Sequence, residues 1–198
     1  MNFIIRRGLM KKLRLPNRLG FTLVELALVL VIVGLLITGV LKGEALIQNA
    51  KVKKLVNQKE SLSAAYYTFY DRYGMYPGDE NSTSFPTGDT HAGDGDGRIE
   101  TNLSEHYRLF EDLELSGIIN GSYNGTSELA TNAFGGDMSI EWGTHYTVQD
   151  NWATFTNIPS DVAEMIDLKN DDGVYNTGSI KANQVYTNTA AKTLWWRM

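Results

Sequence analysis

The feature that most constrains this chain of 198 residues is an apolar run from Phe21 to Leu41. The run contains 21 residues, and its only polar side chains are those of Thr22, Glu25 and Thr38. A helix needs about 20 residues to span a bilayer, whereas the apolar core of a secretory signal has about 7–15. No small-x-small cleavage site follows the run. We therefore expect it to be retained as a membrane-spanning helix.

Charge is distributed unevenly on the two sides of this run. Residues 1–20 carry six basic side chains and no acidic one, whereas the whole chain has 18 Lys and Arg and 23 Asp and Glu. Residues 21–198 therefore have a net charge of −11. Because basic flanks are retained in the cytoplasm, we expect the leader inside and the acidic body outside. An acidic body argues against nucleic-acid binding, and the absence of cysteine excludes disulfides and thiolate metal sites.

Apolar side chains continue beyond Leu41 at spacings of three and four, which predicts one helix through Tyr73 with a buried stripe. The positions of this stripe are Leu41, Ala45, Leu46, Val52, Leu55, Val56, Leu62, Ala65, Tyr66, Phe69, Tyr70 and Tyr73. Gly74 and Pro77 then end the pattern. Residues 42–73 are thus expected to form an amphipathic half that follows the apolar half at 21–41.

Residues 74–198 predict a globular α+β head with long loops. Helices are expected at 103–116 and 160–168, and strands at 139–147, 152–158, 184–187 and 193–197, from their β-branched and aromatic content. In the first of these helices Leu109, Phe110 and Leu113 should point inward, and Gly117 should end it. The expected fold is a long N-terminal helix packed on a small antiparallel β-sheet.

The junction between leader and apolar run carries the most specific motif in the chain. Gly20 ends the basic leader, Phe21 follows it, and Glu25 lies four residues further on. This pattern resembles the class III signal of the type IV pilin-like superfamily, which includes type IV pilins, type II secretion pseudopilins and competence pilins. The resemblance is most specific over residues 14–41. The segments YPGD at 76–79 and GDGDGRIE at 93–100 also resemble segments of pilin-like proteins.

The resemblance implies a pilin-like fold and a processing pathway. A membrane-embedded prepilin peptidase would remove the leader, residues 1–20, by cutting after Gly20, and would N-methylate the new terminal residue, Phe21. A glycine before the cut lets extended backbone enter a protease site without a side-chain clash.

The resemblance also implies a structural role and not an enzymatic one. The chain would begin as a single-pass precursor in the bacterial inner membrane, with its C-terminal domain outside the cytoplasm. An inner-membrane assembly platform would then move it into a pilus or a periplasmic pseudopilus, by self-assembly or with other pilin-like subunits.

Glu25 needs a special explanation, because an acidic residue inside a membrane helix costs roughly 2.5–3.5 kcal/mol on insertion scales. The resemblance implies that Glu25 of an incoming subunit meets the Phe21 ammonium of a neighbour. Opposite charges attract strongly in a low-dielectric core, and each is costly if left unpaired. Glu25 would therefore set the register between subunits during assembly.

Two other classes of function remain open at this point. A membrane-anchored binding module would hold a ligand or exported cargo through its loops, and would gain nothing from Glu25. An exported hydrolase with a signal anchor would need a catalytic constellation, and the sequence contains no recognisable one.

Acidic residues gather in two loop regions that could bind Ca²⁺, a cation that prefers oxygen ligands. These residues are Asp89, Asp94, Asp96 and Glu100 in the first region and Asp167, Asp171 and Asp172 in the second. The EF-hand pattern is not met, since Ala92 and Leu103 stand where its first and last ligands should be. Some pseudopilins bind calcium in their C-terminal loops. The alternative is an acidic loop whose aspartates make Asx-turns.

Overall fold

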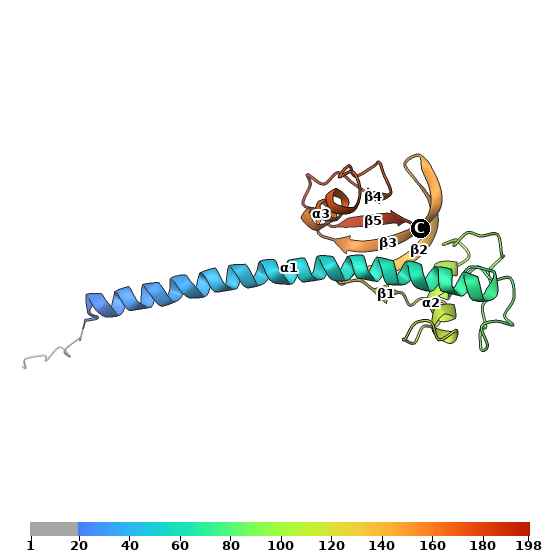
Figure 1. Cartoon of the computed structure of the whole chain (residues 1–198), viewed down its shortest axis with the longest axis horizontal. Helices are drawn as coiled ribbons and strands as arrows, with labels where there is room; N and C mark the ends of the chain where they lie inside the picture. The colour runs from blue at the N-terminus through green and yellow to red at the C-terminus, as the bar shows by residue number, and fades with distance from the viewer. Residues whose placement is uncertain (1–19) are drawn as a thin grey trace, which may run out of the picture. The chain divides into compact units, whose positions relative to one another are not determined.

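The computed structural model describes residues 20–198, so the predictions for the basic leader at 1–19 lie outside the described residues. The chain divides into two compact units, one ending at Ala45 and one running from Leu46 to Met198. Helix α1, Leu23–Tyr73, contributes to both units (Figure 1). The helix predicted through Tyr73 is therefore confirmed, and its second half belongs to the same unit as the head.

The head contains two short helices and a five-stranded antiparallel sheet (Figure 1). The helices are α2, Glu105–Leu115, and α3, Ser160–Asn170. The strands are β1, Ala130–Thr131; β2, Asp137–His145; β3, Val148–Ile158; β4, Ile180–Ala182; and β5, Lys192–Arg197. Their order in the sheet is β1-β2-β3-β5-β4. The predicted α+β fold, a long helix with a small antiparallel sheet, is confirmed.

One stripe of α1 and one face of the sheet form the core of the head. Cross-strand pairs such as Met138–Phe155 and Ile140–Ala153 place alternate strand residues on this face. The buried residues of α1 are Val52, Leu55, Leu62, Ala65, Tyr66 and Phe69. The predicted stripe is wrong at its start, because Leu46 is 71% exposed and burial begins only at Val52, and at Tyr70, which is 42% exposed.

Glycine ends both α1 and α2, as the sequence predicts. Gly74 adopts a φ of +76° and its N–H bonds to the Tyr70 carbonyl. Gly117 has a φ of +69°, and the N–H of Ile118 reaches back to the Leu113 carbonyl at 3.0 Å, which is a Schellman ending. The inward positions predicted on α2, Leu109 and its neighbours Phe110 and Leu113, are all buried.

The strand predicted at 184–187 is wrong, and the edge strand β4 lies at Ile180–Ala182 instead. Residues 184–187 form a turn that α3 side chains hold in place. The Ser160 hydroxyl donates to the Tyr186 carbonyl at 2.6 Å, and the Tyr186 hydroxyl donates to Asp167 at 2.7 Å. The first of these bonds uses the Tyr186 carbonyl, a backbone acceptor that a strand would direct toward a partner strand.

The second face of the sheet carries polar and aromatic side chains. His145 stacks on Trp195, with ring centroids 3.7 Å apart, and meets Trp152 edge to face. Lys181 is 2% exposed, and its ammonium donates to the His145 carbonyl. Burial, and secondarily the charge of Lys181, lower the pKa of His145 to about 4. The neutral imidazole is therefore the form that this face accommodates.

Replacing Phe69 by alanine should strongly destabilise the head, because Phe69 has 0% exposure at the centre of the core. The cavity should lower the free energy of unfolding by about 3–5 kcal/mol. All four tryptophans lie in the sheet, so tryptophan fluorescence of the full chain in detergent measures this. Tyr67→Ala is the matched control, because Tyr67 is 44% exposed and its loss should cost far less. Equal destabilisation by both variants would contradict this packing.

Acid should weaken the head through His145. Its pKa in the folded chain, about 4, lies below the ordinary value of 6.5. Its stabilising contribution is therefore complete above pH 6.5 and is lost as pH falls through 4. His145→Phe retains a ring that can stack on Trp195 and should reduce this loss by about 1–2 kcal/mol, after allowance for solvent screening. Unfolding measured between pH 7 and pH 4 should show a shallower decline for the variant, and an unchanged slope would refute the assignment.

Candidate functional site

The predicted cleavage site lies just before the first turn of α1. Gly20 and Phe21 are outside the helix, which begins at Leu23, and Phe21 is 81% exposed. A side chain added at Gly20 would meet nothing within 4 Å, so packing in the described chain does not require glycine there. A protease needs accessible backbone at the bond it cuts, and Gly20 and Phe21 are exposed and outside the helix.

Thr22 and Glu25 form a capping box that the sequence analysis did not recognise. A Glu25 carboxylate oxygen, Oε2, accepts from the Thr22 N–H at 2.8 Å and from its hydroxyl at 2.9 Å. In return the Thr22 hydroxyl accepts from the Glu25 N–H at 3.2 Å. The spacing Thr-x-x-Glu is the sequence signature of this motif and could have revealed it. Glu25 therefore has a partner within its own chain, and these bonds use only one of its two carboxylate oxygens.

The helix beyond the capping box is apolar on every side. An 18-residue stretch within α1 has a mean hydropathy of 2.8, and none of it is buried. The hydroxyl of Thr38 donates to the Gly34 carbonyl at 2.9 Å, so this polar group is satisfied within the helix. By length and composition this segment could cross a membrane. Its apolar surface requires either lipid or other helices around it.

In the first predicted metal region, Asp94 and Asp96 lie near Asp79, a residue that the sequence analysis had not selected. The buried Asp79 carboxylate accepts from the N–H groups of Gly95, Asp96 and Gly97 at 2.8–3.1 Å. Burial raises the pKa of Asp79 to about 6, against the opposing effect of these hydrogen bonds. Backbone donors thus occupy both oxygens of Asp79.

Asp94 and Asp96 themselves act as turn residues. Asp94 accepts from the N–H of Asp96, and Asp96 accepts from the N–H of Arg98 at 2.9 Å, which are Asx-turn contacts. The guanidinium of Arg98 also lies 3.1 Å from the Asp96 carboxylate. Glu100 falls in none of the clusters formed by the described acidic and histidine residues.

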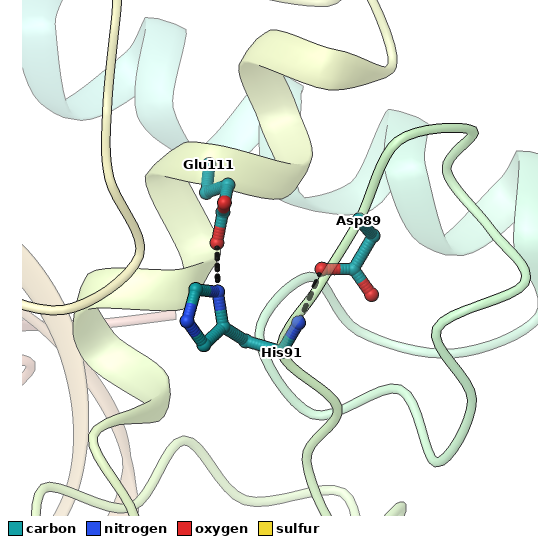
Figure 2. Close-up of side chains that lie close together, drawn as sticks. All are labelled: Asp89, His91 and Glu111. Atoms are coloured by element: carbon teal, nitrogen blue, oxygen red, sulfur yellow. Dashed lines mark hydrogen bonds and ion pairs between the residues drawn. The ribbon is translucent and has the colours of Figure 1, made fainter.

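Asp89, also in the first predicted region, lies with His91 and Glu111 (Figure 2). The His91 ring nitrogen Nδ1 lies 2.8 Å from Glu111 on α2, and Asp89 Oδ1 accepts from the His91 N–H at 2.9 Å. Figure 2 shows His91 between the two carboxylates, with its ring directed at Glu111 and its backbone at Asp89. The contact of His91 with Glu111 holds the 89–91 loop against α2.

Asp89 also belongs to a second group, with Glu80 and Asp112, that is buried throughout. Burial raises the pKa of both Glu80 and Asp112, because a low-dielectric interior disfavours their ionised forms. The sequence analysis missed Glu80 and Asp112, since one follows the YPGD turn and the other lies on α2, far from the glycine-rich stretch. Only the folded chain brings them together.

The three aspartates of the second predicted region, Asp167, Asp171 and Asp172, do gather as predicted. Each has donors from the chain. Asp167 accepts from the Tyr186 hydroxyl and the Gly173 N–H, Asp171 from the Ile180 N–H at 2.7 Å, and Asp172 from the Thr177 hydroxyl at 2.6 Å. Burial raises the pKa of Asp167. These contacts join the end of α3 to the edge strand β4.

Comparison with known proteins gives a match to one family model, the prokaryotic N-terminal methylation motif, over residues 15–41. The matched residues contain Gly20, Phe21 and Glu25 and end at Leu41. Together with the long N-terminal apolar helix, the match supports a type IV pilin-like protein. No curated protein matches the chain, and no solved structure does.

The match has further general implications. It implies processing by a prepilin peptidase and assembly of the pilin-like kind. The motif is typical of structural proteins and not of enzymes. The apolar helix is consistent with single-pass anchoring of a precursor in a membrane.

Proposed function

We propose that this chain is a structural subunit of a type IV pilus-like filament or of a type II secretion pseudopilus. The observation that carries the proposal is the placement of Gly20–Phe21 in exposed backbone immediately before an apolar helix that contains Glu25. The chain is inserted into the bacterial inner membrane, cut after Gly20 and N-methylated at Phe21. The assembly platform then transfers it to the filament, where α1 helices form the core.

The exposed surface of α1 supports assembly through this helix. Large apolar side chains are exposed on all sides of the segment up to Leu41, among them Leu23 at 87% and Leu30 at 73%. A membrane covers such a surface in the precursor. After extraction from the membrane, the same surface needs neighbouring helices, so a filament core of packed helices fits it.

The capping box sharpens the role that we assign to Glu25. Because its bonds to Thr22 use Oε2, the other oxygen, Oε1, is available to an ammonium from a neighbouring subunit. The carboxylate also stands in the first turn, where the helix dipole favours negative charge. Glu25 therefore starts its own helix and, in this proposal, also receives the Phe21 ammonium of the next subunit.

A second function, an anchored binding module, is favoured by one observation. The second unit has an open groove of about 560 Å³ between α1, α2 and the segments that follow α2. Its lining is mainly apolar and includes Leu62, Phe110, Tyr123 and Met138, with Lys53 and Lys54 among the polar members. A module of this kind would need the anchor but not cleavage at Gly20 or the charge of Glu25.

Co-expression with a prepilin peptidase should yield a mature chain that begins at N-methylated Phe21, measured by mass spectrometry of the intact protein. Gly20→Val should block the cut, because the protease site must accept the side chain before the scissile bond. Gly34→Val is the matched control, since Gly34 is another glycine with no neighbour within 4 Å of an added side chain. Its product should begin at Phe21. An unsubstituted chain that still begins at Met1, or one that is cut after Leu41, would refute the proposal.

Glu25→Gln should abolish incorporation into sheared filaments while leaving insertion and cleavage intact. Glutamine can also complete a capping box, so this variant removes the charge and preserves the helix start. Thr22→Val is the complementary control, because it removes the capping hydroxyl and retains the carboxylate; it should assemble far better than Glu25→Gln. Glu25→Val removes both functions and should fail to assemble. Normal incorporation of Glu25→Gln would count against charge pairing between subunits.

A further inference from the structure

Three carboxyl groups meet inside the head from different parts of the chain. Glu80 follows the turn at 76–79, Asp89 lies in the next loop, and Asp112 projects from α2. One oxygen from each lies within 4.8 Å of the others. Glu80 and Asp112 have 0% exposure and Asp89 has 7%. The group is therefore enclosed by protein and not placed at the surface.

Four carboxylate oxygens of this group are buried, and the described chain offers them no hydrogen-bond donor except the carboxyl groups of Glu80 and Asp112 themselves, which lie within hydrogen-bonding reach of each other. They are Glu80 Oε1, Glu80 Oε2, Asp89 Oδ2 and Asp112 Oδ1. The remaining two oxygens are held by backbone N–H groups. His91 donates to Asp89 Oδ1 at 2.9 Å, and Gly78 donates to Asp112 Oδ2 at 2.5 Å. The backbone thus fixes two of the carboxylates and leaves the other four oxygens of the group without a backbone donor.

No basic side chain of residues 20–198 compensates this charge. The ion pairs found there join Arg98 to Asp96 and Arg197 to Asp150, and the contact of the His91 ring is with Glu111; none of them includes the side chains of Glu80, Asp89 or Asp112. Buried carboxylates that lack both donors and counter-charges are rare in folded proteins. Either shared protons or a bound cation must therefore occupy the space between them.

We propose that Glu80, Asp89 and Asp112 bind one Ca²⁺ ion in the interior of the head. A set of oxygen ligands that is rich in carboxylates and contains no sulfur suits a hard divalent cation. Neither oxygen of Glu80 accepts a hydrogen bond from a backbone N–H or a basic side chain, which fits the bidentate coordination that Ca²⁺ accepts. Mg²⁺ fits less well, because it usually retains several waters and demands near-octahedral geometry, whereas this group is fully enclosed.

The other acidic groups differ from this one because their carboxylates have hydrogen-bond donors. The carboxylates of Asp79, Asp167, Asp171 and Asp172 accept hydrogen bonds from backbone N–H or hydroxyl groups. Among the clusters of acidic and histidine side chains in the described residues, the buried oxygens that lack a hydrogen-bond partner belong to Glu80, Asp89 and Asp112. Of the residues that the sequence analysis selected, only Asp89 belongs to this site.

The proposed ion would fasten the loop that carries Glu80 and Asp89 to helix α2. Gly78 already packs so tightly on α2 that an added Cβ would lie 2.4 Å from the Glu105 carbonyl. The contact between His91 and Glu111 lies beside the site and holds the same loop (Figure 2). The inference concerns the stability of the head alone, and it is independent of cleavage, methylation and filament assembly.

The test uses the full chain in detergent, stripped with a chelator and dialysed at pH 7.5. Adding 1 mM CaCl₂ should raise the melting temperature, followed by tryptophan fluorescence, by about 5 °C. Excess chelator should reverse the shift, and elemental analysis of the desalted protein should give one calcium per chain. MgCl₂ at the same concentration should give a smaller shift.

Glu80→Gln keeps the shape of the side chain and should abolish the calcium-dependent shift. Asp112→Asn should do the same, and it serves as the second variant if Glu80→Gln fails to fold. Asp96→Asn is the matched control, because that carboxylate is exposed and already paired with Arg98; it should respond like the natural chain. The absence of a calcium shift would overturn the proposal in favour of shared protons. A larger shift with Mg²⁺ would overturn the choice of ion, and a shift that persists in both Glu80→Gln and Asp112→Asn would overturn the choice of site.

Discussion

The packing of one stripe of α1 against the sheet is the contact on which the rest of the head depends. Leu55, Tyr66 and Phe69 are at most 1% exposed, and they meet the face of the sheet formed by alternate residues of its strands. Association of apolar surface of this kind is the main driving force of folding. The loops, the acidic groups and α2 are arranged around this contact, and the membrane-compatible part of α1 reaches the head through the same continuous helix.

The elements that the sequence predicts correctly are those whose signal is local. The period of the apolar side chains gives α1, and glycines with positive φ end α1 and α2 at the expected residues. Strands β2, β3 and β5 follow from runs of β-branched and aromatic residues. The edge strand β4 was misplaced, because Tyr186 and its neighbours are held by Ser160 and Asp167 across the chain. Such side-chain contacts leave no periodic pattern.

The candidate sites also divide into those with a local sequence signal and those that depend on contacts across the chain. Gly20, Phe21 and Glu25 are recognisable because their spacing along the chain is itself the signal, and the methylation motif covers them. The acidic groups are different, because carboxylates close in sequence need not share a site. Asp94 and Asp96 turn toward Asp79, whereas Asp89 joins Glu80 and Asp112 from another loop and a helix. Burial and missing donors distinguish these groups, and both properties exist only after folding.

The capping box at the start of α1 allows the helix start to form independently of leader removal and of neighbouring subunits. Its hydrogen bonds join residues three apart, so it can form without any neighbour and before the leader is removed. It fixes the first helical residue at Leu23 and leaves Gly20 and Phe21 outside. Residues 22–25 thus determine where backbone accessible to a protease ends and helical backbone begins. The motif therefore fixes where the helix starts, through contacts within four consecutive residues.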